Sequence, residues 1–230
     1  MYLRDLAFGA DPEIVERYQK GFVATFARHS HCMVELFLSH LYRRISTPDT
    51  AKVCIVGTDQ LNRPPKESEV QVMINVLAFP WPFDFMRYER ADNREKKELM
   101  VQGIHDGLMW IGKIREWDVG PIDEALRACR NEDYRFEGFW TKKTWTSPNK
   151  KHRIKVYFVF DLDEVKLFAV LFDRKNNKLG KTLIATHFPV QDAIRALVGE
   201  GKWKSAKKFE LKSNSTYWKH KWTVDLGDLV

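Results

Sequence analysis

Basic and aromatic residues alternate in two stretches of the second half of the chain, residues 153–157 and 217–221. In an extended strand every second side chain shares a face. If both stretches lie in one sheet, its outer face offers cations for phosphate or carboxylate groups and rings for stacking, which suits single-stranded nucleic acid or an acidic protein. The alternative is a solvated face whose lysines guard the sheet edge. The predicted partner-binding residues are Arg153, Lys155, Tyr157, Tyr217, Lys219 and Lys221.

Carboxylates gather in the turn Asp161-Leu162-Asp163-Glu164, and Glu164-Val165-Lys166 has the Glu-x-Lys spacing of many metal-dependent nucleases. Two acids and a lysine on adjacent strands could hold Mg²⁺ and position a water. Acidic residues are, however, ordinary in hairpin turns, and the same triplet recurs at Glu210-Leu211-Lys212. We therefore assign no catalytic residue to this turn.

Histidines suggest two further kinds of chemistry. His29-Ser30-His31-Cys32 brings potential zinc ligands together, but a zinc site needs two more, and the other Cys and His residues are scattered singly. His105-Asp106 could form an acid–base pair, yet neighbouring helical residues point about 100° apart. The sequence predicts no metal ligand, no catalytic residue and no cofactor.

Common nucleotide-binding and hydrolase motifs are missing from the sequence, which has no P-loop, no Gly-x-Gly-x-x-Gly, no Gly-x-Ser-x-Gly and no Cys-x-x-Cys. The sequence therefore gives little support to these enzyme classes. An enzyme whose site is assembled from distant residues stays open, because catalytic groups need not be close in sequence.

The charge is distributed unevenly along the 230 residues. Residues 1–133 carry 18 Lys and Arg against 21 Asp and Glu, whereas residues 134–230 carry 20 against 10. Of the 20 basic residues in the second part, 16 are lysines, and lysine is a weaker sign of phosphate recognition than arginine. An acidic partner for the second part is the main prediction from charge.

Three well-separated cysteines, Cys32, Cys54 and Cys129, are typical of reduced thiols in a reducing compartment. The first residues carry charge where a signal peptide would be apolar, and no apolar run is long enough to span a bilayer. We expect a cytoplasmic protein without membrane contact.

The strongest predicted element is a helix over residues 93–117, in which Met100, Ile104, Leu108, Ile111 and Ile114 form one apolar stripe. Gly103 and Gly107 lie one turn apart on it and predict close approach of a neighbouring element. Gly120-Pro121 should break the helix before a shorter one over 122–131. The Pro80-Trp81-Pro82-Phe83 segment is expected to end a strand and to fill the core; the alternative is an exposed aromatic anchor for a partner.

Other periodicities predict a helix over 11–27, a strand over 32–41, and strands over 52–57 and 70–79. After residue 133 the pattern becomes that of an antiparallel meander. Its strands are expected at residues 134–146, 153–160, 165–172, 179–188, 206–211 and 216–226, with a short helix at 190–198.

These patterns predict an α+β protein: an N-terminal α/β part (1–133) with a central helical pair packed on a basic, mainly antiparallel C-terminal sheet (134–230). The two parts are expected to share one core. The predicted function is a non-enzymatic protein-interaction module with an acidic protein partner, for example a bacterial toxin-neutralising immunity-type inhibitor. The alternative is a nucleic-acid-binding protein or a metal-dependent nuclease that uses the basic sheet.

Overall fold

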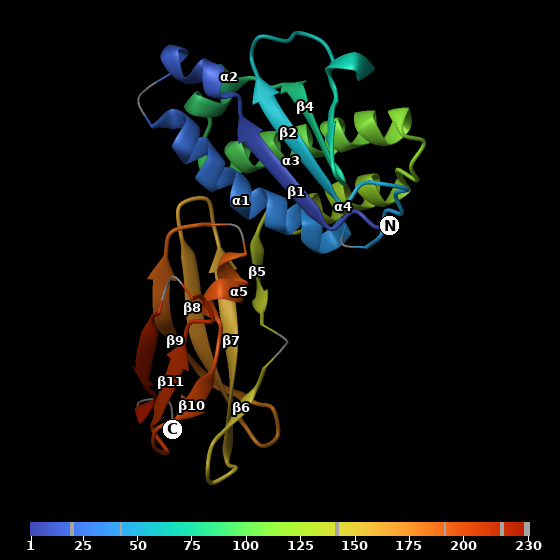
Figure 1. Cartoon of the computed structure of the whole chain (residues 1–230). Coiled ribbons are helices and arrows are strands. Elements are labelled where there is room, and N and C mark those ends of the chain that lie inside the picture. The colour runs from blue at the N-terminus through green and yellow to red at the C-terminus, as the bar shows by residue number, and fades with distance from the viewer. Residues whose placement is uncertain (19–20, 42, 141–142, 191, 217–218, 228–230) are drawn as a thin grey trace. The chain divides into compact units, whose positions relative to one another are not determined.

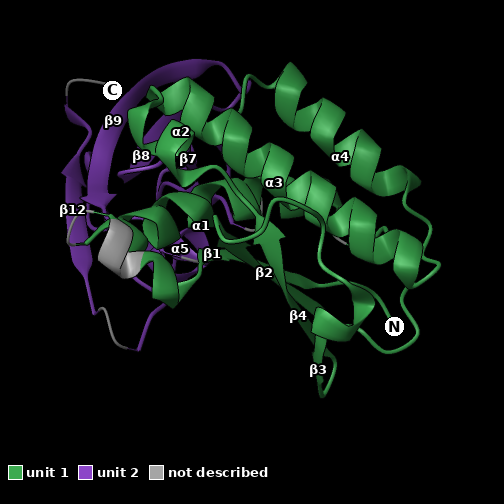
Figure 2. Ribbon diagram, turned by 90° about the horizontal axis from the view of Figure 1, so that it is seen from above, with its two compact units in different colours: residues 1–136 green, residues 137–230 purple. Residues whose placement is uncertain are grey.

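A computed structural model of the chain describes residues 1–18, 21–41, 43–140, 143–190, 192–216 and 219–227. It contains helices, a mixed sheet and antiparallel sheets, so the protein belongs to the mixed α+β class (Figure 1). Two compact units divide the chain, unit 1 at Met1–Phe136 and unit 2 at Glu137–Val230 (Figure 2). Among the described residues, no helix has the length and apolar character that crossing a bilayer requires.

Unit 1 is built on a four-stranded sheet in the order β1-β2-β4-β3. Strands β1 (Asp5–Ala10), β2 (Lys52–Thr58) and β4 (Val76–Pro82) run parallel, and the short strand β3 (Gln71–Met73) is antiparallel to β4. Two short 3₁₀ segments, η1 (Pro12–Arg17) and η2 (Glu67–Glu69), lie in the connections. The parallel arrangement requires a crossover, which the helix α1 (Phe22–Leu41) makes between β1 and β2.

Helix α1 overturns two predictions at once. Residues 32–41 are not a strand, because they continue the helix that begins at Phe22, and the helix predicted for residues 11–27 is replaced by η1 and the first turns of α1. The alternation of Val34, Leu36 and Leu38 does not indicate a strand, because Val34 and Leu36 are buried on this helix together with Phe26, Met33 and Phe37.

Three more helices follow β4, namely α2 (Phe85–Arg90), α3 (Asn93–Ile114) and α4 (Gly120–Asn131). Helices α1 and α3 share a sheet face, because the Phe8 ring contacts Phe26 of α1 and lies 3.1 Å from the position that a Cβ at Gly103 would occupy. The predicted close approach at Gly103 and Gly107 is confirmed: a Cβ at Gly107 would lie 2.9 Å from Ile55 of β2. The contacts of α3 therefore lie on the N-terminal sheet, whereas the sequence prediction had the helical pair on the C-terminal one.

The proline-aromatic segment continues β4 instead of ending it. Pro80 and Pro82 are tolerated because β3 pairs with β4 only as far as Ala78, so β4 is an edge strand beyond that point. Trp81, Phe83 and Phe85 are buried, which confirms the predicted core role of this segment.

Unit 2 contains two antiparallel sheets. The larger has the order β5-β7-β8-β9, with β6 also paired to β7, and the smaller has the order β10-β11-β12. The bounds are β5 Phe136–Phe139, β6 Trp145–Thr146, β7 His152–Phe160, β8 Val165–Asp173, β9 Lys178–His187, α5 Ala193–Leu197, β10 Gly201–Trp203, β11 Lys208–Lys212 and β12 Lys221–Asp225. Alternate residues of both sheets, including Val156, Leu167, Phe209 and Leu211, form its buried core.

Candidate functional site

The six residues predicted to bind a partner do not form one face. Arg153, Lys155 and Tyr157 lie on one side of β7, as the alternation predicts. Lys221 belongs to β12, which pairs with β11 in the other sheet, and Lys219 precedes that strand. Tyr217 lies outside the described residues. The prediction of one continuous face was wrong because it required β7 and β12 to lie in the same sheet.

Residues from neighbouring strands replace the missing ones beside Lys155 and Tyr157. Tyr157 is directly opposite Phe168 of β8, and Val170 of β8 has Lys155 on one side and Lys181 of β9 on the other. We call the following set the ring-and-lysine face: Phe139, Lys155, Tyr157, Phe168, Phe172 and Lys181. Its rings are partly exposed, and Phe139 at 40 % exposure is the most open of them. The sequence predicts a strand at β8. Because most residues on both faces of this strand are apolar, the sequence does not show which face is exposed to solvent.

Both lysines of this face lie over aromatic rings. The Lys181 ammonium is 3.8 Å from the Phe168 centroid and 4.3 Å from that of Tyr157. Lys155 lies 5.4 Å from the Phe172 centroid and 5.9 Å from that of Phe139. Such cation–π contacts are worth about 0.5–1 kcal/mol at exposed sites and restrict the lysine rotamers. The two lysines thus favour rotamers that keep their charges over the rings before any partner arrives.

Arg153 also makes contacts within unit 2. Its Nη2 donates to the backbone carbonyls of Asp173 and Arg174 at 3.4 and 3.1 Å, and to Asn176 Oδ1 at 2.7 Å. The guanidinium therefore anchors the turn between β8 and β9 through one of its two terminal nitrogens.

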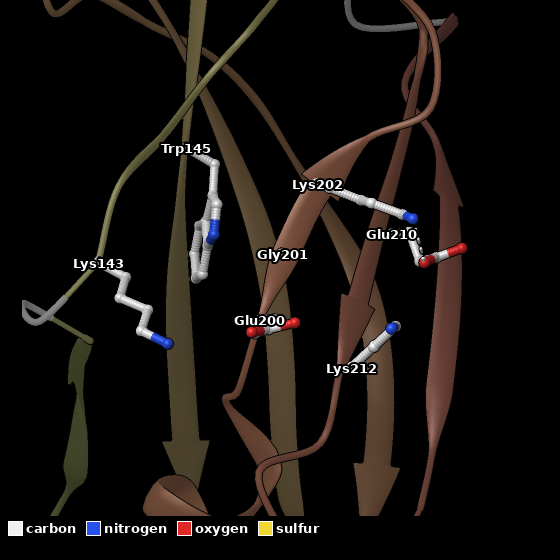
Figure 3. A pocket seen from close by; sticks show the side chains of 7 residues that line it. All are labelled: Lys143, Trp145, Glu200, Gly201, Lys202, Glu210 and Lys212. Carbon is white, nitrogen blue, oxygen red and sulfur yellow. Dashed lines mark ion pairs between the residues drawn. The ribbon is translucent and has the colours of Figure 1, made fainter.

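A second basic feature is a pocket beside the smaller sheet, with a volume of about 370 Å³ (Figure 3). We call it the lysine pocket. It is lined by Lys143, Trp145, Glu200, Gly201, Lys202, Glu210 and Lys212. Position 201 requires a glycine for this packing, because a Cβ there would lie 2.5 Å from Phe209 and 2.7 Å from the Trp145 ring. The Trp203 indole N–H donates to the Trp145 carbonyl at 3.2 Å and ties β10 to β6.

Glu210 is the electrostatic centre of the smaller sheet. Its side chain is only 2 % exposed, and its carboxylate lies 3.1 Å from Lys221, 3.5 Å from Lys204 and 3.9 Å from Lys202. Burial raises the pKa of Glu210, but the hydrogen bond from Lys221 and the charges of Lys204 and Lys202 outweigh it, so the net pKa is lowered. A stable carboxylate thus holds three ammonium groups on one sheet face.

The carboxylates of the acidic turn between β7 and β8 make local hydrogen bonds that are ordinary for a turn. Asp161 accepts a hydrogen bond from the Leu162 amide at 2.8 Å, and Lys166 donates to Glu164 within the Glu-x-Lys triplet. Within the part of the chain that the structure describes, no group of three or more His, Cys, Asp or Glu side chains is placed to hold a metal ion.

The histidines form pairs that the sequence did not reveal. His29 Nδ1 and Tyr88 Oη are joined by a buried hydrogen bond of 2.6 Å, and burial lowers the pKa of His31. His105 contacts Asp106 at 2.7 Å through Nδ1 and Asp123 at 2.8 Å through Nε2. The expectation that His105 and Asp106 do not face each other was wrong, because the short aspartate side chain reaches the ring nitrogen nearest the backbone.

One face of the unit 1 sheet is mostly apolar. The helix contacts given below for the described residues all lie on the opposite face. Helices α1, α2 and α3 contact the face of Phe8, Ile55 and Gly57, and Figure 2 shows α3 and α4 on one side of β2 and β4. The other face is partly exposed and consists mostly of small apolar residues: Ala7, Gly9, Cys54, Val56, Val76, Ala78 and Pro80. Parallel sheets are almost always covered on both faces, so this one is suited to protein contact.

Comparisons with known proteins give no match: no family model, curated protein or solved structure is similar to this chain. Functional inference therefore rests on the geometry of the two units.

Proposed function

We propose that the protein is a binding module that recognises an acidic protein partner through the ring-and-lysine face of unit 2. A bacterial toxin-neutralising immunity protein is the concrete example of such a non-enzymatic inhibitor. The observation that carries the proposal is the placement of Lys155 and Lys181 over the rings of β5, β7 and β8. Ordered cations lose little side-chain entropy on binding a carboxylate, and their charge speeds association with an acidic surface.

The same geometry favours a protein partner over single-stranded nucleic acid. Bases bind to open ring faces, but the Lys181 ammonium lies over both Phe168 and Tyr157 and reduces the ring surface that is left for stacking. The exposed leucines of β9, Leu179 and Leu183, add apolar surface next to these charges. A cationic, partly apolar surface matches the mixed chemistry of a protein interface better than a phosphate backbone. The apolar sheet face of unit 1 gives further support for protein contact.

The experiment is quantitative affinity capture from extracts of the source organism, with the full chain as bait. Wild type is compared with the double variant Lys155→Glu, Lys181→Glu, and the matched control is Lys151→Glu, Lys175→Glu, which changes two exposed turn lysines of the same unit. We expect a stoichiometric acidic protein that the double variant recovers at least about tenfold less well, because two like charges then oppose the partner. The control should recover it as wild type does.

Equal recovery by both variants, or recovery of no stoichiometric protein, would contradict the proposal. Fluorescence anisotropy with a labelled single-stranded oligonucleotide and the same variants tests the alternative function, which is nucleic-acid binding. Strong, salt-sensitive oligonucleotide binding that the double variant loses would favour a nucleic-acid function instead.

A further inference from the structure

The most exposed large apolar side chains among the described residues of unit 1 are consecutive. Val72 and Met73 belong to β3 and are each 61 % exposed, and Ile74 follows them in the turn to β4 and is 93 % exposed. Figure 2 shows β3 and this turn at the rim of the unit 1 sheet. Single apolar residues are ordinary on a protein surface, whereas a contiguous group of this kind indicates a contact site.

Strand β3 is an edge of the four-stranded sheet, and β4 is its neighbour there. The two-residue turn Ile74-Asn75 joins these strands, so Met73 and Val76 form a hydrogen-bonded pair. Because hydrogen-bonded and non-hydrogen-bonded pairs alternate along an antiparallel ladder, the N–H and C=O of Val72 are directed away from β4. Among the described strands β3 has no second neighbour, so this edge is open to pairing with another strand.

Edge strands are ordinarily protected from such pairing by lysine, by proline, by a bulge or by their shortness. Apart from its three residues, β3 has none of these features. Gln71-Val72-Met73 is uncharged, and its register with β4 is regular at all three positions. No charged residue occurs between Glu69 and Asp84. The edge therefore does not repel a second strand.

The composition of β3 suits a second copy of itself. If two copies pair antiparallel about a two-fold axis at Val72, this residue lies opposite its own equivalent, and Gln71 lies opposite Met73 of the second copy. Two β-branched residues then face each other, which is a favourable cross-strand pair, and no like charges meet. Ile74 lies opposite Val70 of the second copy, so the apolar contact continues beyond the strand. A strand from a different protein would be selected by charges or pockets at the edge, and residues 70–76 carry no charge.

We propose that the protein forms a two-fold symmetric homodimer by antiparallel pairing of β3 with β3 of a second copy. The pairing joins the two four-stranded sheets into one continuous sheet. The N–H and C=O of Val72 bond to the same groups of its equivalent, and the exposed Val72, Met73 and Ile74 side chains become part of the interface. Because the same edge is used by both copies, the assembly closes at two chains and does not extend into a fibre.

Sedimentation of the full chain in the analytical ultracentrifuge measures its oligomeric state. We expect a monomer–dimer equilibrium at concentrations up to about 100 μM, a range that detects dissociation constants of that order. Val72→Lys places two positive charges opposite each other at the two-fold axis and should weaken dimerisation at least about tenfold. The matched control is Met86→Lys, at a residue of α2 that is 56 % exposed, and it should dimerise as wild type does. A monomer throughout this range, or a dimer that Val72→Lys leaves intact, overturns the proposal.

A mixture of two charge variants tests the symmetry of the contact. Val72→Glu alone should be monomeric, as Val72→Lys is, because like charges meet in both homodimers. An equal mixture of the two variants should form a dimer, since a lysine then lies opposite a glutamate. This recovery also shows that both variants are folded. No dimer in the mixture would mean that Val72 does not lie opposite its own equivalent.

A disulfide tests the register independently. In a hydrogen-bonded antiparallel pair the Cα atoms lie about 5.5 Å apart, a separation that suits a disulfide. Mild oxidation of Val72→Cys should therefore give a covalent dimer on a nonreducing gel. Wild type, in which Cys54 is partly exposed, and Met86→Cys are the controls and should remain single chains. Failure of Val72→Cys to cross-link, or equal cross-linking of Met86→Cys, overturns the pairing of β3.

Discussion

Asp123 of α4 accepts a hydrogen bond from His105 Nε2 of α3 across 2.8 Å and links the two helices. Asp106 lies 2.7 Å from the other ring nitrogen, so both N–H groups of a charged imidazole have a carboxylate acceptor. Gln102 donates to Asp106 at 2.7 Å and accepts from Arg130 of α4 at 2.9 Å, which extends the network between the same helices. The contact between α3 and α4 thus includes a titratable group.

The first prediction concerns the pH dependence of this link. Burial lowers the pKa of His105, but the hydrogen bonds to Asp106 and Asp123 outweigh it, so the pKa is raised above its ordinary value. A raised pKa stabilises the folded state fully below the unfolded pKa of about 6.5, and this contribution is lost as the pH rises through the folded pKa. His105→Gln should therefore lower the free energy of unfolding by about 1–2 kcal/mol at pH 5.5. At pH 9 the loss should be smaller.

Urea unfolding of wild type and His105→Gln at both pH values measures this difference. Taking the difference between the two proteins cancels the titration of groups that His105 does not contact. His187→Gln, at a histidine of unit 2, serves as the control substitution. An effect of His105→Gln that is equal at pH 5.5 and 9 would show that the imidazole charge does not stabilise the contact between the helices.

The second prediction concerns the backbone at Gly201. A methyl group there would meet the rings of Phe209 and Trp145 at 2.5 and 2.7 Å, and both rings pack against each other with centroids 5.4 Å apart. Gly201→Ala should destabilise unit 2 by about 1–3 kcal/mol, the usual cost of overpacking. Gly138→Ala is the control, since its nearest side-chain atoms would lie 3.9 Å away. Thermal unfolding followed by tryptophan fluorescence compares the two, and a similar melting temperature for both variants would contradict the prediction.

The third prediction concerns Arg153 and its contacts with the turn between β8 and β9. Because its guanidinium bonds three acceptors of the β8–β9 turn, Arg153→Gln should cost about 1–2 kcal/mol and increase amide hydrogen exchange at Asn176 and Asn177. Lys151→Gln, an exposed substitution just before β7, should change neither. Unaltered exchange in Arg153→Gln would mean that the turn holds its conformation without the arginine.

The long helix α3 shows what the sequence predicts well. Its apolar stripe and its glycines are local signals, and the structure confirms the helix and the close contacts at Gly103 and Gly107. The helix ends at Ile114, before the predicted end at residue 117, and Gly120-Pro121 begins α4 instead of ending α3. Strand β1 was missed because it has only six residues, and because Ala7 and Gly9 separate Leu6, Phe8 and Ala10, so no alternation of apolar with polar residues is visible. Short elements are stabilised by their partners, and β1 depends on pairing with β2 more than 40 residues away.

The candidate site shows where local patterns stop being informative. Alternation correctly placed Lys155 and Tyr157 on one side of β7, but it cannot tell which strand lies beside them. Lys181, from β9, completes the ring-and-lysine face, and Lys221 joins Glu210 in another sheet. Glu210 itself was passed over because Glu-Leu-Lys occurs readily in a lysine-rich strand; its burial between Phe209 and Leu211 depends on the long-range pairing of β11 with β10 and β12.

The last prediction concerns the two faces of the unit 1 sheet and uses neighbouring residues of β2. Ile55 points into the core below α3 and is 1 % exposed, whereas Val56 points to the partly exposed face. Ile55→Ala should lower the free energy of unfolding by about 3 kcal/mol, as deletion of core methyl groups does. Val56→Ala should cost less than about 1 kcal/mol, because less surface is removed from a packed environment. Urea unfolding of both variants tests the arrangement: equal costs would mean that the face of Val56 is packed as tightly as the helical side, and would remove it as a surface for protein contact.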